Sequence, residues 1–334
     1  MTKKRLGFVI KFLVSGGLLW ALFRDIDLIQ TKDLMLNAAP GLVLAAVLVL
    51  LVQIVISVFR WRAVLAAIET PLTFLKGLQI FYIGIFFNQA LPSSVGGDFV
   101  RMYRTYKTGI HLSGAINGVM LERVATVAAL AVLVLATQPF FLPRVEGDAA
   151  AWIAPAAGLL FFAAVAGVGF LMILDRLPPS LRRWRLVRGL AMLAGDTRKV
   201  FLAPRHAGRA MGWSLVGHVN LTFAVFVLSM ALALDVTMID CMALIPPVIL
   251  ITTIPISIGG WGVREQAMVI AFGLIGVPKE SATALSILLG LIAMATALPG
   301  GALWLTSGGE RGEVKAAEEM ADGLAGESKD SAGG

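Results

Sequence analysis

Long apolar runs separated by short charged segments dominate this sequence. The runs approach the ~20 apolar residues that a helix needs to cross the hydrocarbon core of a bilayer. We expect six full membrane spans, at residues 6–23, 41–59, 113–137, 151–174, 210–234 and 281–306. The pattern therefore predicts an all-α polytopic membrane protein.

Two further apolar segments end in the same ten-residue pattern. The first copy runs from Pro92 to Arg101 and the second from Pro255 to Arg264, and both read P-x-S-x-G-G-x-x-V-R. Proline removes a backbone donor and paired glycines free the backbone dihedrals, so we expect each helix to break there. Such a break at membrane depth is tolerated only when it is buried in protein or lines a wet cavity. Matching broken segments in two halves of a chain indicate a transporter's binding site.

The distribution of basic residues predicts the topology. Lysines and arginines gather in four segments, namely the N-terminus, 60–76, 101–111 and 175–209. Basic segments face the cytoplasm, and all four do so only if 77–90 enters the membrane, breaks and returns. The same reasoning makes 241–277 a second re-entrant hairpin, entered from the opposite side. The alternative is that 263–277 crosses fully, although about 15 residues is short for a crossing.

This topology divides the chain into two similar halves. Residues 1–306 form one integral-membrane domain, with a first half at about 5–137 and a second at about 151–306. Hairpins entering from opposite sides make an inverted repeat, the architecture of many alternating-access transporters. We expect both termini and the basic 175–209 loop to be cytoplasmic. The polar tail, 307–334, is expected to be disordered.

Composition narrows the function classes. The 334 residues are 58% hydrophobic, with a mean hydropathy of +0.84. The net charge of +7 therefore reflects the basic loops of a membrane protein, and we expect no nucleic-acid partner. The single cysteine, Cys241, and three scattered histidines give no metal-binding pattern, and no nucleotide-binding motif is present. We expect no metal and no cofactor.

Glu122 and Arg123 are charged residues inside an expected span. Glu122 follows Ser113 by nine residues, which places it ~14 Å along the helix, near the middle of a ~30 Å core. An ionisable group at that depth is a functional candidate, although a structural ion pair is the alternative. Adjacent helical residues do not face each other, so the two side chains need separate partners. The candidate partners of Glu122 are Arg101, Arg104 and Arg264.

Each repeated pattern also carries the elements of an anion site. A helix that starts after Gly97 or Gly260 presents backbone N–H groups and a positive dipole end. Arg101 and Arg264 follow one turn later, and a guanidinium suits a phosphate or a carboxylate. The alternative is a tight turn whose arginine extends to the headgroups. We expect Asp98 to cap its helix, Asn88 to satisfy freed backbone groups and Glu265 to be a second acid. The expected substrate-binding residues are Asn88, Pro92, Ser93, Ser94, Gly96, Gly97, Asp98, Arg101, Arg104, Glu122, Arg123, Pro255, Ser257, Gly259, Gly260, Arg264 and Glu265.

Four motifs together resemble one family. They are N-Q-x-L-P-S-S-V-G-G-D-x-x-R from Asn88, L-E-R from Leu121, P-I-S-I-G-G-W-G-V-R-E from Pro255 and L-P-G-G from Leu298. Over about residues 5–306 the chain resembles the membrane flippase domain of bacterial lysylphosphatidylglycerol synthases and its stand-alone relatives. The resemblance implies a helical protein of the bacterial cytoplasmic membrane that moves lipids. We expect a stand-alone member that lacks the soluble synthase domain.

The expected function is translocation of a phospholipid or a lipid-linked headgroup, with its phosphate held at mid-membrane by both hairpins. The substrate would be an anionic or aminoacylated phospholipid, or a lipid-linked glycan, and a lipid-synthesising enzyme is a candidate partner. On this interpretation the protein is not an enzyme. The alternatives are a membrane-embedded transferase for lipids or glycolipids, and a non-catalytic partner of a lipid-modifying enzyme.

Overall fold

The computed structural model describes residues 3–91, 96–145, 147–176, 185–253, 257, 259–307 and 316. Within these residues the regular structure is entirely helical. Four predicted site residues lie outside the described part of the chain: Pro92, Ser93, Ser94 and Pro255. The same holds for the tail beyond Ser307, apart from Ala316. The all-α prediction is confirmed for the part of the chain that is described.

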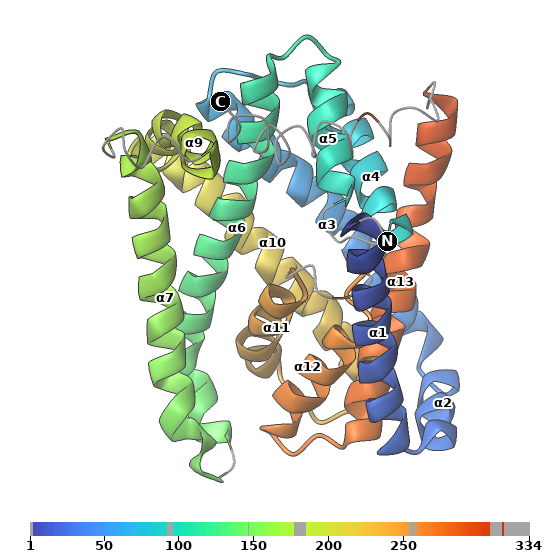
Figure 1. Cartoon of the computed structure of the whole chain (residues 1–334). Helices are drawn as coiled ribbons and strands as arrows, with labels where there is room; N and C mark the ends of the chain where they lie inside the picture. Colours follow the sequence, from blue (N-terminus) through green and yellow to red (C-terminus); the bar gives the residue numbers. More distant parts are fainter. Residues whose placement is uncertain are drawn as a thin grey trace.

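Long apolar helices form the body of the molecule (Figure 1). Among the described residues, five helices are long and apolar enough to cross a membrane: α3 (Pro40–Ala67), α6 (Leu112–Phe141), α7 (Ala150–Ile173), α10 (Pro204–Ala231) and α13 (Lys279–Thr306). A helix satisfies its backbone polar groups internally, which lipid requires. The predicted first full span falls in α1 (Lys3–Arg24), but only the shorter stretch Phe12–Arg24 is an apolar helix by the same criteria, so five of the six predicted spans are found. The protein is therefore a multi-pass α-helical membrane protein.

Helix α3 is longer than the predicted span. It continues past residue 59 to Ala67 and so encloses Arg60 and Trp61. Apolar residues resume directly after the arginines, and Val64 and Leu65 are fully buried. Arg60 is therefore a buried interior residue of α3 and not part of a connecting segment that follows the helix.

Two helical hairpins occupy opposite ends of the bundle (Figure 1). The first hairpin consists of α4 (Phe74–Ala90) and α5 (Gly96–Tyr106), and the second of α11 (Met238–Thr253) and α12 (Val263–Gly273). In each hairpin the helix is interrupted at the repeated pattern, as predicted. Helices α5 and α12 have 11 residues each and rise ~16 Å, about half of a ~30 Å core. Helix α12 is thus too short for the full crossing considered for 263–277.

Each hairpin packs into its own apolar core. The core around the first hairpin includes Trp61, Phe81 and Leu121, from α3, α4 and α6. The core around the second hairpin includes Leu228 of α10 and Phe272 of α12, together with residues of α11 and α13. Helices α3 and α10 run through both cores and join the two ends of the molecule.

The connections contain more helix than the sequence predicted. One of them is a short helix, α2 (Leu28–Leu36), which is capped by Asp27. The Asp27 carboxylate accepts from the backbone N–H groups of Ile29 and Gln30 at 2.8 and 3.1 Å. Short 3-10 turns lie at Leu142–Arg144, Gly147–Ala149 and Leu174–Arg176.

The predicted basic loop, 175–209, contains helix α9 (Arg185–Phe201) and the first turns of α10. Asn117 of α6 donates to Asp196 of α9 at 2.8 Å. Arg198 of α9 also donates to Asp175 at 2.9 Å. The segment is therefore a helix docked on the end of the bundle that holds the first hairpin.

Candidate functional site

Five charged side chains meet where α3, α5 and α6 pack together. This charge cluster consists of Arg60, Asp98, Arg101, Glu122 and Arg123. Glu122 is fully buried and accepts from Nε of Arg60 at 2.7 Å and from Nη1 of Arg101 at 3.1 Å. Nη2 of Arg60 contacts the same carboxylate. The intramembrane acid therefore pairs with guanidinium groups from two other helices.

Arg123 points to a different partner, as the helical geometry predicted. Its Nε and Nη2 atoms each lie 2.9 Å from the carboxylate of Asp98. Asp98 also accepts from Nη1 of Arg101 at 3.1 Å. Arg101 thus bridges the two carboxylates and makes the five side chains a continuous network.

Aromatic rings enclose the central guanidinium. Arg101 is 2% exposed, and its Cζ lies 4.5 Å from the ring centre of Trp61 and 4.3 Å from that of Phe81. Its Nε and Nη2 atoms have no hydrogen-bond partner among the described residues, so cation–π attraction supplies the remaining stabilisation. A guanidinium held this way is fixed in place and does not extend to the headgroups.

Two glycines bring the first hairpin together at this point. A Cβ on Gly97 would overlap the carbonyl oxygen of Gly84, and a Cβ on Gly84 would lie 2.6 Å from Cγ of Arg101. The backbone N–H of Gly97 donates to Oδ1 of Asn88 at 2.8 Å. This confirms that Asn88 satisfies a backbone group freed by the break. The first Gly–Gly pair therefore permits close packing of α4 on α5.

The cluster carries one unbalanced charge. Three arginines face two carboxylates, so one positive charge is in excess. Four of the side chains are at least nine-tenths buried, whereas the Arg123 side chain is 41% exposed. The excess charge is consequently accessible only through Arg123. An accessible guanidinium backed by a buried network can bind a phosphate or a carboxylate.

The second hairpin holds a smaller and neutral pair. Arg264 donates from Nη2 to Glu265 at 2.7 Å, and its Cζ lies 4.7 Å from the ring centre of Trp261. Ser286 of α13 donates to the same carboxylate at 3.1 Å. The backbone N–H of Gly262 donates to Glu265 at 2.6 Å. Glu265 is thus a second buried acid, and it belongs to a local ion pair.

Glycine has a different role in this hairpin. Gly259, Gly260 and Gly262 have φ values of +58°, +82° and +83°, a left-handed region that favours glycine. Ser257 is buried beside them, at 2% exposure. The second glycine pair therefore reverses the chain direction, whereas the first permits close packing.

Several sequence predictions about this site are wrong. Arg101 and Arg264 each have a carboxylate partner in their own hairpin, so they do not form one shared phosphate clamp. Arg264 is not a partner of Glu122, and Arg104 donates to Ser307 at 3.0 Å. Asp98 is not a cap, because α5 begins at Gly96 and the carboxylate binds two arginines.

Two of the backbone donors at these helix starts are also engaged. The N–H of Gly97 is used by Asn88, and the N–H of Gly262 is used by Glu265. Protein side chains thus replace the anion at these two positions, and the candidate anion site moves to Arg123.

Sequence reasoning missed the residues that complete the cluster from other helices. Arg60 and Trp61 of α3 are distant in sequence from both repeated patterns, and Phe81 lies on α4 in the first hairpin. All three contact Glu122 or Arg101. His218 of α10 lies near them and hydrogen-bonds the Thr126 carbonyl of α6 at 2.9 Å. The one available signal was the apolar run after Arg62, which placed Arg60 inside a helix.

The fold and the buried network define a class, a polytopic helical membrane protein with a charge cluster buried between its helices. The sequence matches the family described as lysylphosphatidylglycerol synthase TM region over residues 8–301. The chain therefore belongs to that family, and the resemblance drawn from its motifs is confirmed. No curated protein was found to match the sequence significantly.

Proposed function

We propose that this protein translocates a phospholipid, or another lipid with a phosphate headgroup, across the membrane. The observation that carries the proposal is the charge cluster, whose excess positive charge is accessible at Arg123. A lipid phosphate would bind Arg123 at the edge of the cluster while its acyl chains stay in the bilayer. The family description, which names a lysylated phospholipid, supports a lipid as the substrate.

The arrangement of the hairpins supports transport over catalysis. Broken helices that enter from opposite ends are typical of transporters that alternate access around a central site. Both carboxylates of the cluster are paired with guanidinium groups, which stabilise the ionised form and make each carboxylate a weak general base. On this proposal the protein is a transporter and not a transferase, and the two halves act as an inverted repeat.

We further propose that the protein lies in the bacterial cytoplasmic membrane with both termini in the cytoplasm. Lys107 follows α5 and Asp235 follows α10, and both are exposed. A cysteine at position 107, in a Cys241→Ala background, should react with an impermeant maleimide only from the cytoplasm. A cysteine at position 235 should react only from outside. Labelling of both positions from the same face would contradict this orientation.

Arg123→Gln should slow lipid translocation about tenfold and leave the fold intact. It removes the accessible cation and makes the cluster neutral, and a charge-assisted hydrogen bond contributes roughly 1.5–3 kcal/mol when buried and less when partly exposed. The measurement uses purified protein in liposomes with fluorescent phosphatidylglycerol, and quenching by dithionite reports each leaflet. Size-exclusion profiles and thermal unfolding check the fold.

Arg144→Gln is the matched control. The Arg144 side chain is also 41% exposed, and its Nε lies 2.6 Å from Asp240, which is fully buried. Both substitutions break an ion pair between a partly exposed arginine and a buried aspartate, but only Arg123 belongs to the charge cluster. Equal slowing by the two variants would show that Arg123 acts through stability. Absence of translocation by the wild-type protein would favour the transferase or the non-catalytic partner.

A further inference from the structure

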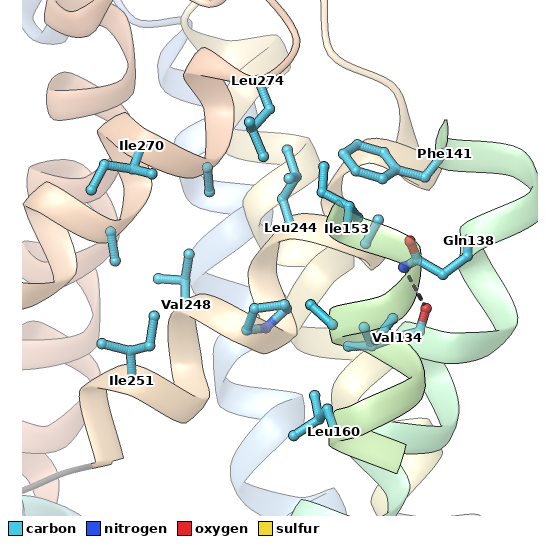
Figure 2. Close-up of a pocket in the computed structure, with 16 residues that line it drawn as sticks. Val134, Gln138, Phe141, Ile153, Leu160, Leu244, Val248, Ile251, Ile270 and Leu274 are labelled. Atoms are coloured by element: carbon cyan, nitrogen blue, oxygen red, sulfur yellow. Dashed lines mark hydrogen bonds between the residues drawn. The ribbon is translucent and has the colours of Figure 1, made fainter. Parts of the chain in front are cut away.

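An apolar cavity of about 320 Å³ lies beside the second hairpin, and none of its lining residues is an arginine. Helices α6, α7, α11 and α12 form its walls (Figure 2). Its lining runs from Val134 to Phe141 on α6 and from Ile153 to Leu160 on α7, so it extends ~10 Å along the helices. Its size falls in the range of small-molecule sites, which are mostly apolar with few polar groups.

The cavity is continuous with the surface that faces lipid. Two of its lining side chains, Ile251 and Ile270, are 44% and 67% exposed, and Ala156 of α7 is also exposed. Helix α7 is the least enclosed of the long helices, since only 11% of its most apolar stretch is buried. The alkyl chains of the bilayer therefore have direct access to the cavity. An unfilled space there would forfeit the dispersion contacts of its lining.

One polar atom in this lining has no partner. Gln138 is 6% exposed, and its Nε2 donates to the carbonyl of Val134 at 2.8 Å. Its Oε1 is buried without a hydrogen-bond donor among the described residues. A buried acceptor left unpaired costs free energy, so this atom calls for a ligand that carries a donor.

The depth of Gln138 indicates where that donor sits on the ligand. Helix α6 has 30 residues and rises ~45 Å, against a hydrocarbon core of ~30 Å. Its last turns therefore reach the membrane interface, and Gln138 lies one turn before the end at Phe141. A membrane lipid has its headgroup at this level and its acyl chains below it.

We propose that the cavity holds one acyl chain of a glycerophospholipid whose headgroup bears a hydroxyl, which donates to Oε1 of Gln138. Phosphatidylglycerol has this chemistry, whereas a phosphatidylcholine headgroup has no donor. The proposal is independent of translocation, because the cavity would hold the chain whether or not the lipid crosses. It also gives the second hairpin a contact with lipid that the charge cluster does not provide.

The test is photolabelling in phosphatidylcholine nanodiscs, where both faces are accessible and no transport is measured. The probe is phosphatidylglycerol with a diazirine near the end of one acyl chain. The matched probe is phosphatidylmethanol with the same chain, which keeps the negative charge and lacks the hydroxyl. We expect label on the α7 and α11 walls of the cavity. Phosphatidylglycerol should label about two- to tenfold more than phosphatidylmethanol, the preference one hydrogen bond supplies.

Three variants separate the outcomes. Gln138→Leu should abolish the preference between the two probes. Ala156→Phe blocks the opening from an exposed position and should reduce labelling by both probes about tenfold. Leu159→Phe, on the same helix at a 72% exposed residue outside the lining, should label like the wild type. Labelling of the cavity walls that Ala156→Phe leaves unchanged would overturn the proposal, as would equal labelling by both probes in the wild type.

Discussion

Glu122→Gln is expected to destabilise the folded protein by about 3–5 kcal/mol, the typical cost of breaking a buried ion pair on one side. Glu122 is fully buried and is the common partner of Arg60 and Arg101. Its neutralisation would raise the excess charge of the cluster from one to two. The measurement is thermal unfolding and monodispersity of the purified variant in detergent. The sequence left open whether Glu122 is functional or part of a structural ion pair, and the network predicts that its substitution will impair folding first.

A charge-balanced double variant is the control for this prediction. Arg60→Gln combined with Glu122→Gln restores the net charge of the native cluster. Residues in one network do not contribute additively, so the double variant should be more stable than Glu122→Gln alone. A double variant with the sum of the two single losses would contradict the network. Normal stability of Glu122→Gln would mean that the carboxyl is not ionised in the native protein.

Gly97→Ala should disrupt the first hairpin, with a loss of several kcal/mol of stability. The added methyl would overlap the backbone oxygen of Gly84 and approach Oδ1 of Asn88 at 2.7 Å. Backbone cannot rotate away as a side chain can, and overpacking of a filled interior typically costs about 1–3 kcal/mol or more. Unfolding temperature and translocation should both fall, because α5 carries Asp98 and Arg101 into the cluster.

Gly167→Ala provides the comparison. Gly167 lies in α7, and a Cβ at this position would meet no atom within 4 Å. Alanine is the better helix former, so this variant should be as stable as the wild type or slightly more stable. Equal behaviour of the two alanine variants would show that close packing of α4 on α5 is not required.

The sequence was sufficient for features that depend on local pattern. Apolar runs of membrane length predicted α3, α6, α7, α10 and α13, and proline with paired glycine predicted both breaks. The separation of Glu122 from Arg123 followed from helical geometry alone. These predictions succeed because each depends on residues near one another in the chain.

Features that depend on packing between distant helices were not predictable in this way. Arg60 reaches Glu122 across 62 positions, and no local pattern links the two. The shared clamp failed for the same reason, since the repeat gave Arg101 and Arg264 equal positions without showing their partners. Only the assembled bundle shows that Arg101 pairs with a carboxylate from α6, whereas Arg264 pairs with a carboxylate from its own helix, α12.

The position in the second half that corresponds to Glu122 is Gly290, nine residues after Ser281. A Cβ at Gly290 would overlap Nη2 of Arg264, so the guanidinium occupies the space that a side chain would need. The first half thus stabilises its arginine with an acid from the next helix, whereas the second half uses Glu265 from the same helix and fills the place at Gly290 with the guanidinium itself. The two halves are consequently not interchangeable modules. Exchanging Glu122 and Gly290 would drive a Glu side chain at position 290 into the space of the Arg264 guanidinium, and would leave Arg60 and Arg101 without their acid at position 122.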